Sequence, residues 1–180
     1  ENENVIIFAG LDHEHDAEGK DRKDMKLPYG QDRLIREVLK ANPNAVVVII
    51  GGSPVEMKDW YDEAKAILWC YYAGMEGGRA LARVLFGDVN PSGKLAESFP
   101  KKHTDCPAHI MGDFGNSEKI TYKEGVFVGY RYYDSRNIEV QFPFGYGLSY
   151  TSFKYSGLKV AVDETEKDDV TVKIQVNIKN

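Results

Sequence analysis

The sequence is poor in features that mark several common classes of protein. It has only two cysteines, Cys70 and Cys106, and their wide separation argues against a disulfide framework. Cys70 lies in an apolar run, where a cysteine is most simply a small buried side chain. The apolar runs are short, and none approaches the ~20 residues that a membrane-spanning helix needs. We therefore expect neither a disulfide-stapled scaffold nor a membrane as a partner.

Positive charge is also scarce. The chain has 23 Lys and Arg against 28 Asp and Glu, a formal net charge of -5, and no strongly basic block. Proteins that bind nucleic acids typically carry a basic patch, so we expect no nucleic-acid partner. With 42% hydrophobic and 28% charged residues, the composition is typical of a soluble protein and is compatible with a cytoplasmic or a secreted location.

The first hundred residues alternate between strand-like and helix-like patterns. A continuous β-branched run at 45–50 is typical of a strand covered on both faces, as in a parallel sheet. The sequence predicts an α/β fold: a mostly parallel sheet flanked by helices, also called an α/β sandwich. The expected strands are 5–9, 45–50 and 66–72, and an edge strand or an extended crossing is expected at 94–100. The expected helices are 31–40, a helix beginning at Ser53, and 76–86.

The pattern changes in the second half. Gly, Pro, Tyr and Phe dominate 101–147, which predicts an ordered, aromatic-rich connection without a convincing helix. Segments 153–160 and 170–178 alternate with period two and predict antiparallel strands, joined by an acidic connection at 163–169. Two such strands need further neighbours. We therefore expect an α/β domain at 1–150, the first strands of an incomplete β-sandwich at 151–180, and a larger parent protein.

The loop at 11–24 holds the densest group of ionisable side chains. It follows the first expected strand, and ligands of open α/β sheets bind beyond the carboxyl ends of the strands. Glu18 is the strongest candidate for a proton donor, because the following Gly19 permits backbone geometry that could direct the Glu18 side chain out of the domain. Arg22 could pair with Asp21 or Asp24 and stiffen the loop. The alternative is that Glu18 is one of many exposed acids.

Other motifs have simpler structural explanations. His13 and His15 could suggest a metal, but their spacing in a loop is weak evidence, so a solvated polar loop is favoured and no metal is expected. Ser53 is not in a nucleophile elbow, and capping of the expected helix accounts for it. The glycine-rich stretch 74–78 lacks the spacing of a phosphate-binding loop, which favours tight packing between a strand and a helix.

Taken in order, several motifs closely resemble the carboxyl-terminal half of the glycoside hydrolase family 3 β-glucosidases. The resemblance covers nearly the whole chain. It rests on Gly10-Leu11, Ala17-Glu18-Gly19-Lys20-Asp21-Arg22, Leu27-Pro28, Gln31, Gly52-Ser53-Pro54-Val55, Trp60, Gly74-Met75-Glu76-Gly77-Gly78, the run from Leu85 to Leu95, Phe99-Pro100, the run from Tyr122 to Asp134, and the run from Phe142 to Thr151.

The resemblance implies a division of catalytic labour. In the family, an amino-terminal (β/α)8-type barrel supplies an Asp nucleophile and most of the sugar pocket, and the α/β sandwich domain supplies the general acid/base. That residue falls on Glu18 here, with Glu14 as the runner-up and Asp21 and Arg22 as supporting residues. A fibronectin type III-like domain would begin near Thr151.

This resemblance also implies the wider function. The parent would be a retaining β-glucosidase that acts on a β-glucoside or oligosaccharide, docks this chain against its barrel domain, and needs no cofactor. A homo-oligomer is compatible with it. The alternatives are a β-xylosidase or another family 3 glycosidase, a non-catalytic α/β module that binds carbohydrate or a partner, and a metal-binding module at residues 12–16.

Overall fold

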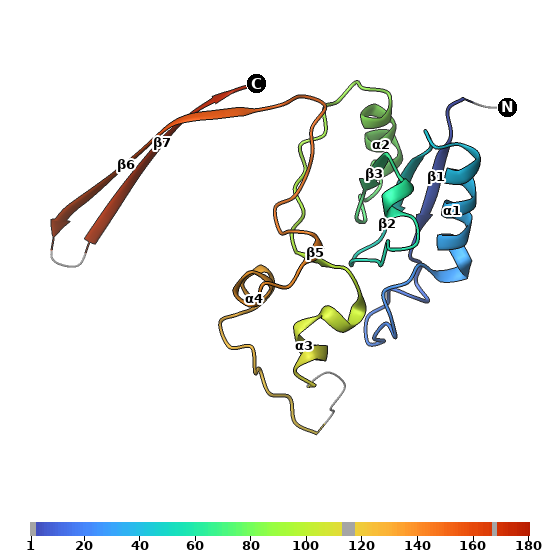
Figure 1. The fold of residues 1–180 in the computed structure, drawn as a ribbon, viewed down its shortest axis with the longest axis horizontal. Coiled ribbons are helices and arrows are strands. Elements are labelled where there is room, and N and C mark those ends of the chain that lie inside the picture. The colour runs from blue at the N-terminus through green and yellow to red at the C-terminus, as the bar shows by residue number, and fades with distance from the viewer. Residues whose placement is uncertain (1–2, 113–117, 167–168) are drawn as a thin grey trace.

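The structure is a computed structural model and describes residues 3–112, 118–166 and 169–180. Three parallel strands form its main sheet, in the order β1-β2-β3. They are β1 (Ile6–Gly10), β2 (Val46–Ile50) and β3 (Ala66–Trp69). Figure 1 shows this sheet with its helices at one end of the molecule and a long ribbon of two strands at the other. The predicted fold class, a parallel sheet with helices followed by antiparallel strands, is confirmed.

The core lies between β2 and helix α1 (Gln31–Ala41), whose predicted position is confirmed. Ile35 and Leu39 of α1 are buried in the same apolar cluster as Val47 and Ile49 of β2. Val47, Val48 and Ile49 of β2 point alternately to the two faces of the sheet and are all fully buried, so both faces of this strand are shielded over most of its length, which explains its continuous apolar sequence.

The connection between β2 and β3 corrects one prediction. No helix begins at Ser53; irregular backbone leads to a short 3-10 helix, η2 (Tyr61–Glu63). Val55, Met57 and Trp60 are all buried in the core, and the spacing of two residues between Val55 and Met57 is that of an extended segment rather than of one helix face. Burial of this segment therefore overrides the capping signal in the sequence.

The region after β3 differs from the prediction in detail. The strand ends at Trp69 rather than at residue 72, and Tyr71 adopts a positive φ of 47° that turns the chain. Helix α2 (Gly77–Leu85) forms as expected, but none of its residues is buried and Ala80, for which the pattern predicts an inward position, is exposed. The expected tight packing at 74–78 is wrong for most of that stretch, since Met75 is 99% exposed.

The aromatic-rich connection is more helical than its sequence indicates. Its first strand, β4 (Phe99–Pro100), pairs antiparallel with β5 (Val140–Phe142). Between them lie the 3-10 helix η3 (His103–Asp105) and helices α3 (Pro107–Ile110) and α4 (Tyr130–Arg136). Helix α4 buries two adjacent tyrosines, Tyr132 and Tyr133, and so shows no apolar stripe at helical spacing.

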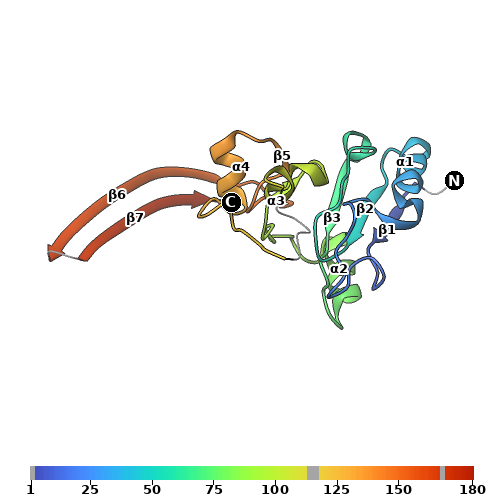
Figure 2. The same ribbon diagram turned by 90° about the horizontal axis from the view of Figure 1, so that it is seen from below.

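The last two strands form a separate antiparallel sheet, as predicted. β6 (Lys154–Glu166) and β7 (Asp169–Lys179) extend away from the α/β part as a curved ribbon (Figures 1 and 2). The acidic stretch predicted as a connection is largely strand, because β6 runs to Glu166; residues 167–168 lie outside the described part. Cross-strand pairs such as Val160 with Ile174 are apolar, yet both side chains are more than half exposed.

Within the described ranges, no helix has the length and apolar character that crossing a membrane requires.

Candidate functional site

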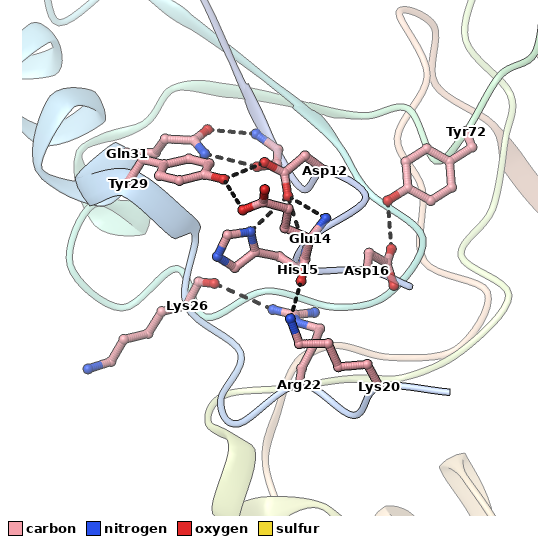
Figure 3. A network of polar contacts seen from close by, with 11 residues as sticks. Asp12, Glu14, His15, Asp16, Lys20, Arg22, Lys26, Tyr29, Gln31 and Tyr72 are labelled. Carbon is pink, nitrogen blue, oxygen red and sulfur yellow. Dashed lines mark hydrogen bonds and ion pairs between the residues drawn. The ribbon is translucent and has the colours of Figure 1, made fainter. Parts of the chain in front are cut away.

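The polar loop begins where β1 ends, at the carboxyl edge of the parallel sheet. Its first residue, Leu11, donates a backbone hydrogen bond to the carbonyl of Ile50 (2.9 Å) and is buried. The side-chain amide of Gln31, at the start of α1, bonds both the N–H (2.8 Å) and the carbonyl (2.9 Å) of Gly10. The start of the loop is therefore fixed to both β2 and α1, and Figure 3 shows the Gln31 side chain directed toward the loop.

Asp12 is the centre of the first polar cluster in this loop. Its carboxylate accepts a hydrogen bond from the Tyr29 hydroxyl (2.7 Å) and lies 2.7 Å from Nδ1 of His15 (Figure 3). Backbone N–H groups of Glu14 and His15 donate to the same carboxylate. The Tyr29 hydroxyl, followed by His15, holds the pKa of Asp12 well below its usual range. The same bond raises the pKa of Tyr29 to about 12.

Glu14, the runner-up for the acid/base role, faces this cluster. One of its carboxyl oxygens lies 3.4 Å from the Tyr29 hydroxyl, and its backbone carbonyl accepts a hydrogen bond from Nζ of Lys20 (3.2 Å). Figure 3 shows the Glu14 side chain directed toward Tyr29. Its carboxyl group thus points back into the loop's own polar network.

Glu18 occupies a different position, in a tight turn. Ala17 and Lys20 form an antiparallel bridge that closes the turn, and Gly19 has a φ of 74°. A side chain would strain the backbone there, which accounts for the glycine. Glu18 is exposed, and no side chain or backbone group in the described part of the protein hydrogen-bonds to its carboxyl group. The turn therefore presents this carboxyl group outward.

Both ends of the turn are attached to the segment that follows β2. Before the turn, Oδ2 of Asp16 accepts hydrogen bonds from the Tyr72 hydroxyl (2.6 Å) and the Gly52 N–H (3.1 Å). After it, Nη1 of Arg22 donates to Oγ of Ser53 (2.9 Å) and to the carbonyl of Pro54 (3.0 Å). Burial lowers the pKa of the Arg22 guanidinium, and the nearby Asp16 opposes that shift.

These contacts correct two predictions. Arg22 stiffens the loop, but it does so through Ser53 and Pro54; among the described residues it forms no ion pair with Asp21 or Asp24. Ser53 serves as the acceptor for Arg22 rather than as a helix cap. Asp21 is exposed and borders the cavity described next.

A cavity of about 570 Å³ opens beside the turn, and no pattern in the sequence indicates it. The loop contributes Asp21 and Arg22 to its wall, and distant segments contribute Glu97, Cys106 and Tyr133. Burial raises the pKa of all three distant groups, so their neutral forms are favoured. Since the wall comes from segments far apart in the chain, only the fold brings it together.

The two histidines of the loop are not arranged as metal ligands. His15 packs edge-on against the Tyr29 ring, with the ring centroids 5.0 Å apart. Nowhere in the ranges 3–112, 118–166 and 169–180 do three or more His, Cys, Asp or Glu side chains gather in a way that could hold a metal ion. Cys70 and Cys106 are both free and half-buried, so Cys70 is less enclosed than expected.

A comparison with known protein families identifies the chain's relatives. Residues 1–150 match the model described as the glycosyl hydrolase family 3 C-terminal domain. The chain belongs to glycosyl hydrolase family 3. The resemblance noted in the sequence is thereby confirmed, and the loop with its turn lies within the matched domain.

Individual family 3 relatives carry a consistent name. The chain is 49% identical over 176 residues to "Thermostable beta-glucosidase B" of Acetivibrio thermocellus, covering 98% of the chain and 23% of that protein. The structure of DesR, a β-glucosidase from Streptomyces venezuelae in complex with D-glucose, superposes with a TM-score of 0.86 at 40% identity, covering 97% of this chain and 22% of that one.

A second solved structure agrees. The β-glucosidase from Kluyveromyces marxianus in complex with glucose has a TM-score of 0.82 and 46% identity, covering 88% of this family 3 chain and 19% of that one. The chain thus spans roughly a fifth to a quarter of the length of these relatives.

Proposed function

We propose that this chain is the part of a retaining β-glucosidase that supplies the general acid/base, and that Glu18 is that residue. The observation that carries the proposal is the turn at 17–20, which presents an unengaged carboxyl group while both of its ends are anchored. Support for the substrate class, a terminal β-glucosyl residue of a glucoside or oligosaccharide, comes from relatives named as β-glucosidases.

The chemistry explains why the site needs the rest of the protein. A retaining glycosidase uses two carboxyl groups about 5–5.5 Å apart: a nucleophile, and a residue that first donates a proton to the leaving group and then activates water. In our proposal a barrel domain outside this chain carries the Asp nucleophile and most of the sugar pocket. Glu18 would meet that nucleophile only when the two domains are docked.

Glu18 is favoured over Glu14 by their surroundings. The carboxyl group of Glu14 lies near the Tyr29 hydroxyl and is directed toward the loop's own polar network. A proton donor must instead reach the oxygen of a bound substrate, which an outward-facing side chain at a turn can do. Arg22 holds the end of the turn, and Asp21 borders the adjoining cavity, so we propose supporting roles for both.

The proposed division into an α/β domain at 1–150 and the start of a fibronectin type III-like domain at 151–180 accords with the sheet pattern. β6 and β7 pair with each other and with no other strand of the described chain. Because they make a separate sheet, we propose that they stabilise the enzyme together with further strands rather than take part in catalysis.

The proposal is tested by Glu18→Gln in the full-length enzyme. Protonation matters most when the departing oxygen is basic, and general acid–base catalysis is typically worth ~10²–10⁴-fold. We expect a loss of that order for substrates with poor leaving groups and a much smaller loss in glucosylation by activated aryl glucosides. Glu14→Gln is the matched control and should stay within a few-fold of the parent. A loss in Glu14→Gln alone would transfer the role to Glu14.

A further inference from the structure

The carboxylate of Asp16 connects the ends of all three parallel strands. Asp16 lies in the loop after β1, Gly52 follows β2, and Tyr72 follows β3. Oδ2 of Asp16 accepts a hydrogen bond from the Tyr72 hydroxyl at 2.6 Å and from the Gly52 N–H at 3.1 Å. Hydrogen bonds to an ionised acceptor are about twice as strong as those between neutral groups. This carboxylate is therefore the main polar link between the loop and the β3 side of the sheet (Figure 3).

The backbone at Gly52 is shaped for this contact. A Cβ atom at this position would lie 2.8 Å from Cε2 of Tyr72 and 2.9 Å from Oδ2 of Asp16, closer than such atoms approach. Only glycine lets the Asp16 carboxylate and the Tyr72 ring approach the same peptide N–H. The close approach of both the Tyr72 ring and the Asp16 carboxylate thus accounts for the glycine at this position.

Asp16 and Arg22 bracket the turn from its two sides. Asp16 binds Gly52, and Arg22 binds Ser53 and Pro54, so both attach to one short segment of backbone. The bridge between Ala17 and Lys20 closes the turn between them. A short, closed turn with both ends fixed has few conformations left, so its tip points in one direction. Glu18 sits at that tip.

We propose that Asp16 is a positioning residue for the acid/base: its bonds to Tyr72 and Gly52 aim the Glu18 carboxyl group at the leaving-group oxygen. This inference rests on the proposed role of Glu18. Asp16 itself touches no substrate in this account. A misplacement of about 1 Å can cost 10²-fold in rate, so releasing one end of the turn should be visible in the protonation step.

The test uses the full-length enzyme and compares two leaving groups. Asp16→Ala removes both hydrogen bonds and should lower kcat/KM for a glucoside with a poor leaving group by about 10–100-fold. The loss for an activated aryl glucoside should be a few-fold. Asp16→Asn keeps an acceptor oxygen and should recover part of the loss, and Tyr72→Phe, which removes one hydroxyl, should show a weaker form of the same pattern.

A matched control lies in the same loop. Asp12 also accepts a hydrogen bond from a tyrosine hydroxyl, at 2.7 Å from Tyr29, but it lies six residues before Glu18 instead of two. Asp12→Ala should leave the ratio of the two kcat/KM values as in the parent. A thermal melt of each variant shows which of them are folded. If Asp16→Ala does not fold, the positioning role is tested instead by the leaving-group dependence of kcat/KM in Tyr72→Phe.

The double variant Asp16→Ala/Glu18→Gln separates the possible outcomes. If Asp16 acts through Glu18, the double variant should be no slower than Glu18→Gln alone, because effects of residues that act as a unit are not additive. The positioning role would be overturned if the kcat/KM losses of the two single variants multiplied in the double variant. It would also be overturned if Asp16→Ala lost the same factor with both substrates. Either result would leave the role of Glu18 intact. If Glu18→Gln shows no dependence on the leaving group, both proposals fail.

Discussion

The side-chain amide of Gln31 bonds both backbone polar groups of Gly10, accepting from its N–H at 2.8 Å and donating to its carbonyl at 2.9 Å. β1 is an edge strand of the described sheet, and Gly10 is its last residue before the polar loop. Gln31 thus takes the place of a further strand at this point. It also fixes the first residue of α1 to the start of the loop that carries Glu18.

Removing this amide should loosen the start of the loop. In Gln31→Ala, the Gly10 N–H loses its acceptor, so we expect its hydrogen exchange to become at least several-fold faster while amides in β2 keep their protection. Exchange monitored by NMR measures this directly. Arg33→Ala, which removes an exposed side chain from the same helix, is the control. Unchanged exchange at Gly10 would mean that Gln31 does not hold the strand end.

The bond between Asp12 and Tyr29 predicts a pH dependence of stability. The pKa of Asp12 is lower in the folded chain than its ordinary value of 3.8. Its stabilising contribution is therefore complete above that value and is lost as the pH falls through the folded pKa. The pKa of Tyr29 rises from 10.0 to about 12, so its contribution is complete below 10.0 and is lost as the pH rises through about 12.

Tyr29→Phe tests this coupling. Because the tyrosine hydroxyl is the largest cause of the Asp12 shift, the pKa of Asp12 should move back toward its ordinary value in the variant. A carbon-detected NMR titration of the Asp12 carboxyl group in the parent and the variant would show it. An identical titration curve in both proteins would contradict the assignment of the shift to this bond.

The ribbon of β6 and β7 should be the least protected regular structure of the 180-residue chain. Among the described residues, its two strands pair with each other alone, and apolar side chains such as Val160 and Ile174 are exposed, whereas Val47, Val48 and Ile49 are fully buried in the central strand. A two-stranded ribbon is marginally stable by itself in water. We expect fast amide exchange from Val160 onward and slow exchange in Val46–Ile50. Equal protection in both would indicate a partner for the ribbon.

Glucoside hydrolysis should be absent from the 180-residue chain alone. In our account the nucleophile and most of the sugar pocket lie in another domain, so an acid/base by itself cannot complete the reaction. An assay of the pure chain with an activated aryl β-glucoside tests this, with the full-length enzyme as the positive control. Measurable turnover by the chain would contradict the proposed division of labour.

The sequence predicted those features that depend on local pattern. The β-branched run at 45–50 and the helix-like pattern at 31–40 each indicated the correct element at the correct place, β2 and α1 respectively. The resemblance in the run around Glu18 indicated the family, and the loop after β1 was correctly expected at the carboxyl edge of the sheet. Each of these signals is contained within one short stretch of chain.

The features that escaped prediction depend on contacts between distant residues. Ser53 carried a capping signal, but its partner is Arg22, 31 residues away, and burial of the following segment prevents a helix. Asp16 accepts a hydrogen bond from Tyr72, which is 56 residues away, and neither local sequence predicts this contact. The residue types were therefore visible in the sequence, whereas their partners were set by the packing of three strands side by side.

Azide rescue of Glu18→Gln in the full-length enzyme is the most direct test of the central claim. The covalent glucosyl intermediate should still form with an activated substrate, since the nucleophile is untouched, and should then persist because glutamine cannot activate water. Azide needs no base, so adding it should restore turnover and yield a β-glucosyl azide. If azide instead rescues Glu14→Gln and has no effect on Glu18→Gln, the acid/base is Glu14, which contradicts the role proposed for Glu18.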